Sequence, residues 1–528
     1  MIFQRIGNRG IRLGTLFERA ARDHPANHLV LDHDLDIAPG LGRRPTIVEL
    51  AELVDDWAAR LWAAGVRPGE HVVVFKSDSF DIPLLACAAG RIGAVPVLLS
   101  PKLDGDVVET LVRRIVTPSL LTDESMLANV LSPSIFEAAG RVLLTSGNHP
   151  DATALWTLDA VERVTPIIAP PTRPALVTHT SGTTGTPKLA VHTGRTLQAR
   201  YRPQALVAGM VRKRRPVAIH VSFVHSRLFT ALAITLLRGF PLLILADDDP
   251  ERVAEMFLRV RPGAIEAHPN SFMRWEDLAA DPRRPLAAVK FFSSTFDALH
   301  PRTVRRMLDA SDHRFPVFGQ LYGQSEVGPV VARAFTKFRS DRSDGRCVGV
   351  PFPGMTGIRV VSRDGGRPTA ATPGYIEVRT DGRVLTYLGE DDRYARQEHG
   401  GWWRMGDIGY RTRWGCVHLL DREVDEIPGF GSTLATEDAL LTRIKQITEV
   451  VIVPNRDGPP IPVVCTKNDQ PLDPRAWRLA VATLPTMSDP VQLRLADLPQ
   501  TATTKIKRLE LARRLGDDQN RSGRPQRV

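Results

Sequence analysis

The chain has 528 residues, of which 43% are hydrophobic and 24% are charged. These values are those of a soluble globular protein, and the length allows several domains with a large buried core. The formal net charge is +10. The arginines are scattered and form no basic stripe interleaved with aromatic residues, so we expect no nucleic-acid partner. The positive charge is compatible with acidic small molecules.

The chain contains four cysteines, at Cys87, Cys347, Cys416 and Cys465. They show neither a CxxC pair nor a spacing typical of metal ligands, which predicts reduced thiols and a cytoplasmic protein. The N-terminus contains no apolar run of signal-peptide length. The most apolar stretch, 231–246, is interrupted by Arg238, Gly239 and Pro241, so it predicts the end of a helix and a strand at 242–245 rather than a membrane span. We therefore expect no membrane partner.

Helices and strands alternate in the N-terminal part of the chain. Thr46 and Glu49 form a capping box at the start of an amphipathic helix over 46–60. Strands are predicted at 71–75 and 94–99, and a helix is predicted between them at 81–92. This alternation predicts an α/β fold with largely parallel sheets.

A loop rich in glycine and hydroxyl side chains, TSGTTGTPK, follows a predicted strand at 175–177. Its two glycines let the main chain turn tightly and bring N–H groups close to an anion, while hydroxyls and a lysine add donors and charge. The candidate phosphate-binding residues are Thr180, Ser181, Gly182, Thr183, Thr184, Gly185 and Lys188. The loop is therefore suited to a polyphosphate. An ordinary Ser/Thr/Gly surface loop is the alternative.

The P-loop of nucleoside triphosphatases fits this stretch poorly. That motif has four residues between its glycines and a Ser or Thr after its lysine. Here only Thr183 and Thr184 separate the glycines, and Leu189 follows Lys188.

The stretch 179–189 resembles, almost letter for letter, the phosphate loop Y-T-S-G-T-T-G-x-P-K-G of the adenylate-forming superfamily. That superfamily contains acyl- and aryl-CoA synthetases, adenylation domains of peptide synthetases and luciferases. His179 and Leu189 differ from the usual aromatic residue and glycine. The resemblance extends from about 15 to 515, with the motifs in the family's order.

The resemblance implies a large N-terminal domain of parallel-rich α/β subdomains with a β-rich subdomain, followed by a small mobile α+β domain. We place the AMP-binding domain at 1–421 and the small domain at 422–515. Residues 516–528 are then a basic tail that we predict to be disordered.

Two further motifs of the family are matched. FGQLYGQSEVGP at 318–329 resembles Y-G-x-T-E, which implies that Tyr322 stacks on adenine and that Glu326, with Thr184, ligates magnesium. Gly323 and Ser325 complete this nucleotide-binding motif. WWRMGDIGYRTRWGCVHLLDR at 402–422 implies that Asp407 binds the ribose hydroxyls and that Arg422 approaches the phosphates or ribose and marks the hinge. In isolation each stretch also fits a polar loop or a surface ion pair.

The substrate side of the resemblance rests on His225, which matches a position that lines the acyl pocket. No aspartate occurs between 222 and 232 to pair with an α-ammonium group, so we predict that the substrate is not an α-amino acid. Thr295 and Phe296 replace two glycines that border the adenine in the family.

The stretch 498–508, LPQTATTKIKR, resembles the family's closing motif and makes Lys505 the candidate catalytic lysine. Several positions in the C-terminal motifs depart from the family pattern, namely Asp421 at the end of the AMP-binding domain and Val424, Pro428, Asp438 and Thr504 in the small domain. A solvated basic loop is the alternative interpretation for the residues around Lys505.

Together these motifs imply an enzyme that uses ATP and Mg²⁺ to convert a carboxylic acid to an acyl-adenylate, which is then transferred to the thiol of coenzyme A. The implied catalytic residues are Lys505, Thr184, Glu326 and His225. Transfer to the phosphopantetheine thiol of a carrier protein is an alternative. A degenerate member that performs one half-reaction, or only binds ligand, is another.

Overall fold

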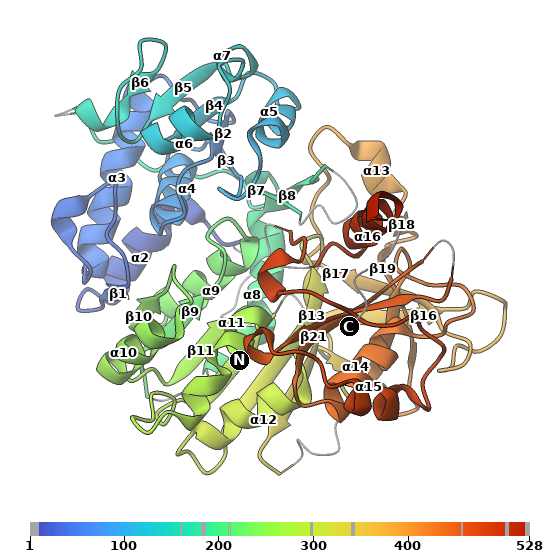
Figure 1. The fold of residues 1–528 in the computed structure, drawn as a ribbon. Coiled ribbons are helices and arrows are strands. Elements are labelled where there is room, and N and C mark those ends of the chain that lie inside the picture. The colour runs from blue at the N-terminus through green and yellow to red at the C-terminus, as the bar shows by residue number, and fades with distance from the viewer. Residues whose placement is uncertain are drawn as a thin grey trace.

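The computed structural model describes residues 10–158, 161–180, 186–209, 211, 213–295, 299–338, 344–455, 458–501 and 506–522. Within these residues the strands form three sheets, of seven, thirteen and three strands (Figure 1). Helices pack on the sheets, and the predicted α/β class is confirmed. None of the helices in this described part of the chain has both the length and the apolar character needed to span a membrane.

The seven-stranded sheet is parallel except at one edge. Its strands, in spatial order, are β6 (Thr153–Ala154), β5 (Arg141–Leu144), β4 (Ser119–Thr122), β2 (His71–Val74), β3 (Val95–Leu98), β7 (Pro174–His179) and β8 (Leu189–Thr193). Only β7 and β8 pair in antiparallel fashion. The predicted phosphate loop joins these two strands. The predicted capping box is present, since Thr46 accepts a hydrogen bond from the backbone of Glu49 at the start of helix α3 (Ile47–Ala63).

The thirteen-stranded sheet is parallel in one half and antiparallel in the other. Its strands, in spatial order, are β1 (Leu29–Leu31), β10 (Leu242–Ile244), β9 (Val217–His220), β11 (Ala264–Ala267), β12 (Phe291–Ser294), β13 (Val317–Gln324), β14 (Gly328–Thr336), β15 (Cys347–Pro351), β20 (Val417–Arg422), β19 (Trp402–Arg411), β17 (Gly374–Thr380) and β16 (Thr356–Val361), with β18 (Glu398–His399) beside β19. The pairs from β1 to β13 are parallel, and those from β13 to β16 are antiparallel. Strand β13, which carries Tyr322, therefore joins the two halves.

An aromatic cluster beneath the parallel half holds β13 in place. Phe318 of β13 is fully buried and stacks on Phe292 of β12, with ring centroids 5.8 Å apart. Phe272 contacts both rings. Offset aromatic packing of this kind fixes side-chain geometry as well as burying apolar area. The start of β13 is thereby anchored on a rigid support.

The third sheet consists of β21 (Ile447–Val453), β22 (Ile461–Thr466) and β23 (Val491–Gln492). Helices α14 (Thr433–Arg443) and α16 (Arg508–Ser522) contact β21. Helix α16 crosses position 515, so the part of the predicted disordered tail that the structure describes, 516–522, is helical. The division into domains at 421 remains a prediction.

Most of the other helices connect or cover the two large sheets, while α15 (Pro474–Val481) packs on α14 beside the three-stranded sheet. The remaining helices are α2 (Leu16–Asp23), α4 (Asp81–Arg91), α5 (Gly105–Arg113), α6 (Glu124–Asn129), α7 (Ile135–Ala138), α8 (Gly194–Gly209), α9 (Ser226–Leu236), α10 (Pro250–Val260), α11 (Pro269–Arg274), α12 (Pro301–Ala310) and α13 (Asp391–Ala395). The predicted helix at 81–92 and the strand at 242–245 correspond to α4 and β10.

Candidate active site

The base of the predicted phosphate loop is closed by two backbone-anchored hydrogen bonds. The amide of Thr180 donates to the carbonyl of Lys188 at 2.9 Å, and the amide of Lys188 donates to Thr180 Oγ1 at 3.1 Å. The predicted ligands Ser181, Gly182, Thr183, Thr184 and Gly185 lie outside the described residues. Their roles remain predictions.

Lys188 meets Glu326 from the turn between β13 and β14, although the two residues are 138 positions apart. Lys188 Nζ donates to Glu326 Oε1 at 2.9 Å and to the Tyr387 hydroxyl at 3.0 Å. The Tyr387 hydroxyl donates to the same carboxylate oxygen at 2.6 Å. Burial alone would raise the pKa of Glu326, but the charge of Lys188 and the bond from Tyr387 outweigh it and lower that pKa. Glu326 is therefore an ionised carboxylate in a buried setting.

The sequence did not indicate Tyr387. The residue is fully buried and follows β17 in a segment that pairs with β8, where Leu385 N donates to Val191 O at 2.8 Å and Leu388 N donates to Leu189 O at 2.8 Å. These backbone bonds place Tyr387 beside Lys188. A single tyrosine in a connecting segment has no local pattern that would single it out.

A second cluster joins Tyr322, Asp407 and Arg422. The Tyr322 hydroxyl donates to Asp407 Oδ2 at 2.6 Å, and Arg422 Nε lies 3.7 Å from Asp407 Oδ1. Asp407 and Arg422 are register partners on β19 and β20. Burial and the neighbouring carboxylate raise the pKa of Tyr322 well above its usual value, so the phenol stays protonated. The fold thus brings together Tyr322 and Asp407, which belong to different motifs and are 85 positions apart.

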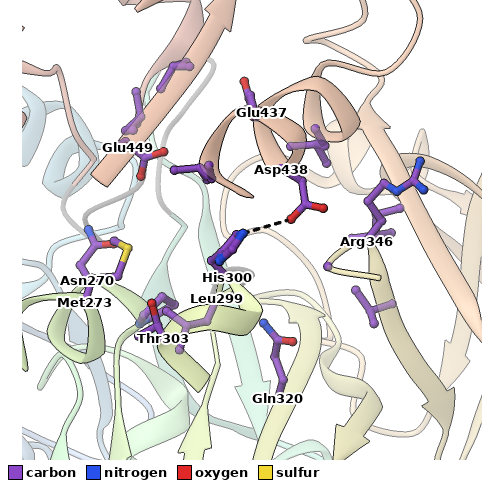
Figure 2. A pocket seen from close by; sticks show the side chains of 18 of the residues that line it. Asn270, Met273, Leu299, His300, Thr303, Gln320, Arg346, Glu437, Asp438 and Glu449 are labelled. Carbon is purple, nitrogen blue, oxygen red and sulfur yellow. Dashed lines mark ion pairs between the residues drawn. The ribbon is translucent and has the colours of Figure 1, made fainter. Parts of the chain in front are cut away.

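This second cluster opens into a cavity of about 400 Å³. Tyr322, Gly323, Asp407 and Arg422 are among the residues that line it. Figure 2 shows other parts of the lining, with Asp438 and Glu449 on one side of the space and Asn270, Met273 and Thr303 on the other. His300 Nε2 and Asp438 Oδ1 are 3.7 Å apart between the two sides. Elements from the middle and from the C-terminal part of the chain therefore build the cavity.

The predicted site residues that the structure describes fall into two neighbouring clusters, and only one of these clusters lines the cavity. Glu326 and Lys188 are absent from the cavity lining, which includes Tyr322 and Asp407. Gln324 connects the clusters, because it lies between Tyr322 and Glu326 and its side-chain amide donates to the carbonyl of Met405.

His225 lies against the same turn as Glu326. It caps helix α9 by accepting from Arg227 N at 3.0 Å, and its Nε2 lies 3.3 Å from Ser325 Oγ. Burial, helped by the charge of Arg200, lowers the pKa of His225 well below its usual value. His225 is therefore a neutral imidazole. Thr295 is buried, while Phe296 lies outside the described residues.

Arg200 is a buried guanidinium that no sequence motif indicated. It donates to Gly382 O at 2.7 Å, to Ser226 Oγ at 3.0 Å and to Ser325 O at 2.9 Å. Burial lowers the pKa of Arg200 to about 9. These bonds tie helices α8 and α9 to the β13–β14 turn, so Arg200 holds the backbone of Ser325 and the side chain of Ser226, the residue after His225.

Lys505 lies outside the described residues, and its role remains a prediction. The nearby residues Gln500 and Ile506 line the cavity that also contains Tyr322, Asp407 and Arg422. The C-terminal motif and the proposed nucleoside-binding residues therefore border the same space.

Glu326 could supply one ligand to a magnesium ion. No group of three or more His, Cys, Asp or Glu side chains in the described ranges is placed to hold a metal by itself. An ionised carboxylate nonetheless suits Mg²⁺, which takes one or two protein carboxylates and completes its shell with phosphate oxygens and water. Such an ion would offset phosphate charge when ATP is bound. Glu326 thus suits a magnesium ion that binds together with the nucleotide.

The family model described as AMP-binding enzyme matches residues 17–388. The chain therefore belongs to this family of adenylate-forming enzymes.

Two relatives and one solved structure are similar to this chain over most of its length. The 3-amino-2-hydroxy-4-methoxybenzoate diazotase of Streptomyces cremeus is 48% identical, covering 96% of this chain and 95% of that protein. The 3-aminoavenalumate diazotase of a Streptomyces species is 26% identical, covering 78% and 75%. The crystal structure of the anthranilate CoA ligase AuaEII in complex with anthranoyl-AMP has a TM-score of 0.81 at 16% identity, covering 97% of this chain and 98% of that one. The structural likeness shows the shared fold.

Replacing Tyr387 with phenylalanine should slow the ATP-dependent reaction. The change removes one hydrogen bond to Glu326 and one from Lys188 but keeps the buried ring. We expect kcat to fall about tenfold, which corresponds to roughly 1.4 kcal/mol for bonds to charged groups. The measurement is AMP formation under steady-state conditions. Tyr394→Phe is the matched control, because the Tyr394 ring contacts Tyr387 while its hydroxyl donates to the carbonyl of Val384. This variant should change kcat little.

Proposed function

We propose that this enzyme uses ATP and nitrite to diazotise an aromatic amine that also carries a carboxylate. The observation that carries this proposal is the 48% identity, over nearly the whole of both chains, to a protein named as a diazotase of an aminobenzoate. A second relative is also named as a diazotase, and both names place an amino group at position 3.

The first step of the proposed reaction is adenylation of an oxyanion. An oxygen of nitrite attacks the α-phosphorus of ATP, the bond to the β-phosphate breaks, and pyrophosphate leaves. The product is a mixed anhydride of nitrous acid and AMP. This step uses the same attack that converts a carboxylate to an acyl-adenylate. The protein has to align the reactants and offset charge, rather than supply a covalent group.

In the second step the aromatic amine attacks the nitroso nitrogen. A nitrogen–nitrogen bond forms, the nitrogen–oxygen bond to AMP breaks, and the amine loses a proton. The resulting nitrosamine takes up one proton and loses water to give the diazonium group. One amine, one nitrous acid and one ATP thus yield one diazonium ion, AMP, pyrophosphate and one water. The two nitrogen atoms exchange electrons only with each other, so no external oxidant or reductant is needed.

The lack of an aspartate between 222 and 232 agrees with an arylamine substrate. An α-ammonium group would need a buried carboxylate partner. An arylamine is neutral near pH 7, because its lone pair is delocalised into the ring, and it needs none. His225 is neutral in this region and could accept a proton as the amine reacts, although its low pKa makes it a weak base.

The other site residues have proposed roles in the adenylation step. Lys188 and residues 180–185 would hold the triphosphate, and Glu326, with Thr184, would ligate magnesium. Tyr322 and Asp407 would bind the adenosine, with Arg422 beside them. Lys505 would offset charge that develops on the α-phosphate. This assignment is supported by the short contacts among Lys188, Glu326 and Tyr387 and by the pairing of Tyr322 with Asp407.

The test is to supply ATP, Mg²⁺, nitrite and a panel of aminobenzoates at slightly alkaline pH, where uncatalysed diazotisation is slow. We expect AMP and pyrophosphate to form only when nitrite is present. The diazonium product should couple to a naphthol dye, and isotope from labelled nitrite should appear as one nitrogen of the diazo group by mass spectrometry. Benzoates without an amino group serve as controls. AMP formation that needs no nitrite would contradict the proposal.

Thioester formation is the second candidate, and the matched motifs from 179–189 to 498–508 favour it. The aromatic carboxylate would then be adenylated and transferred to coenzyme A or to a carrier protein. Repeating the same assay without nitrite, but with coenzyme A, separates the two. An acyl-CoA product together with nitrite-independent AMP release would identify the ligase, and a diazo product would identify the diazotase.

A further inference from the structure

Arg200 of helix α8 is a buried cation to which the proposed reaction steps assign no role. It is 4% exposed, and its three hydrogen bonds go to two backbone carbonyls and one hydroxyl, all of them uncharged. A Cβ atom at Gly328 would lie 2.7 Å from Arg200 Cγ, and one at Gly382 would lie 2.9 Å from the same atom. The surrounding backbone thus leaves room for this long side chain.

The charge of Arg200 is not balanced within the residues that the structure describes. Glu326 is the carboxylate whose charge acts on the guanidinium, and Glu326 Oε1 is already bonded to Lys188 Nζ at 2.9 Å. Two cations therefore share one carboxylate, and Arg200 and Glu326 are both buried. A buried charge is costly unless an opposite charge accompanies it. A bound anion would offset the surplus positive charge.

His225 and Ser325 place hydrogen-bond donors beside this cation. His225 Nδ1 accepts from Arg227 N at 3.0 Å, so the proton of the neutral ring lies on Nε2, and Nε2 lies 3.3 Å from Ser325 Oγ. In this tautomer His225 donates to Ser325 Oγ, and the Ser325 hydroxyl proton can be donated to a ligand. The ring would have to give up its bond from Arg227 N to take up a proton in the second reaction step. Both side chains are partly exposed, whereas Arg200 is buried next to them.

These three side chains combine the features of a site for a small anion. Two partly exposed donors meet at the turn that also carries Glu326, and a guanidinium bonded to the Ser325 carbonyl supplies positive charge. We propose that Arg200, Ser325 and His225 form a subsite for a small planar oxyanion, which is nitrite in the adenylation step. The anion would accept from Ser325 Oγ and share the Nε2 proton of His225. Arg200 would act through its charge as a specificity-determining residue.

The position of this subsite suits an attack on the α-phosphate. Glu326, the proposed magnesium ligand, directly follows Ser325, and Lys188 of the proposed phosphate loop contacts Glu326. Three hydrogen bonds already fix the guanidinium, so it need not rearrange when an anion binds. A carboxylate has the same planar pair of oxygens as nitrite. The proposal therefore rests on the proposed function only in naming nitrite as the anion.

The test is isotope exchange between pyrophosphate and ATP, which reports the adenylation step alone, as the nitrite concentration is varied at fixed ATP and Mg²⁺. In Arg200→Gln we expect the KM for nitrite to rise about 10–100-fold, the effect of losing one nearby charge at the effective dielectric of a protein interior. The KM for ATP should change less than about threefold. Arg200→Lys should be intermediate, because it keeps the charge but not the geometry of the guanidinium.

Arg238→Gln is the matched control. Arg238 is also partly buried and donates to the carbonyl of Ala205 in α8 at 2.8 Å, and it makes no bond to the β13–β14 turn in the described part of the chain. This variant should leave the KM for nitrite unchanged. Ser325→Ala keeps the carbonyl that Arg200 contacts but removes the hydroxyl, and it should raise the KM for nitrite about tenfold. Ser325→Ala decides the question if Arg200→Gln does not fold.

A second readout needs no catalysis. The melting temperature of the ATP-free protein is measured in sodium nitrite and in sodium chloride at the same ionic strength. Nitrite should raise it more than chloride does in the parent and in Arg238→Gln, because a ligand that binds the folded state stabilises it. The difference between the salts should disappear in Arg200→Gln. Equal effects of the two salts on the parent would contradict the subsite.

The kinetic outcomes separate the subsite from a supporting role and from the proposed function. Equal rises in the KM for nitrite and for ATP, or a fall in kcat alone, would show that Arg200 only holds the turn. If the parent needs no nitrite and catalyses exchange with an aromatic carboxylate, the proposed function fails. The variants are then compared by the KM for that carboxylate. A rise in Arg200→Gln and in Ser325→Ala would keep the oxyanion subsite, and an unchanged KM would overturn it.

Discussion

Replacing Glu326 with glutamine should reduce kcat for ATP-dependent AMP formation by about 10²–10³-fold, the range seen when one group that stabilises transition-state charge is removed. Glutamine keeps the shape of the side chain but not its charge. Lys188 would lose its carboxylate partner at 2.9 Å, and a magnesium ion would lose an anionic ligand. Because Glu326 is buried, water cannot compensate for that loss as it would at the surface.

The measurement is steady-state AMP release at several magnesium concentrations. We expect the magnesium concentration for half-maximal rate to rise in Glu326→Gln. Glu251→Gln is the control, because Glu251 forms an exposed ion pair with Arg283 and should affect neither quantity. A Glu326→Gln enzyme with an unchanged magnesium requirement and nearly full activity would show that Glu326 is not the metal ligand.

Much of the fold follows from local patterns in the sequence. The capping box at Thr46, the valine-rich strand at 71–75 and the helix at 81–92 each carry their own signal, because capping and periodicity are properties of a few neighbouring residues. The motif order also placed Lys188 with Glu326 and Tyr322 with Asp407, which the structure brings into hydrogen-bonding distance.

The residues that the sequence did not indicate act through tertiary contacts. Tyr387 reaches Lys188 because its segment pairs with β8, and Arg200 reaches Ser325 because α8 packs beside α9. Glu437 stands next to Asp438 in sequence, and only the direction of α14 decides which of them meets Arg508. None of these contacts leaves a periodic or spacing signal. They depend on the packing of elements far apart in the chain.

The sequence motifs also do not identify the group that attacks the activated intermediate. Nitrite and a carboxylate are both small oxyanions, so the phosphate loop, Glu326 and Asp407 would serve either one in the same way. What differs is the group that attacks the activated intermediate, an amine or a thiol. That choice depends on a few side chains around the second substrate, which the nucleotide motifs do not encode.

Substituting Lys505 with alanine should lower the adenylation rate by about 10²–10³-fold, because a positioned cation that offsets charge at the α-phosphate would be lost. The closing motif gives the residue its assignment, and the lining of the cavity by Gln500 and Ile506 supports it. The measurement is isotope exchange between pyrophosphate and ATP in the presence of nitrite, which reports the first step alone. The KM for ATP should change much less than the exchange rate, since the loss is specific to the transition state.

Lys507→Ala provides the matched control, two positions along the same motif. The ammonium group of Lys507, just before α16, lies 3.1 Å from Glu510 in the first turn of that helix, so its loss should affect that partly exposed pair and not the exchange rate. Equal losses in the two variants would mean that the basic stretch acts only by its overall charge. An intermediate rate in Lys505→Arg would instead indicate that charge at this position matters together with its placement, because the guanidinium keeps the charge but not the geometry of the ammonium group.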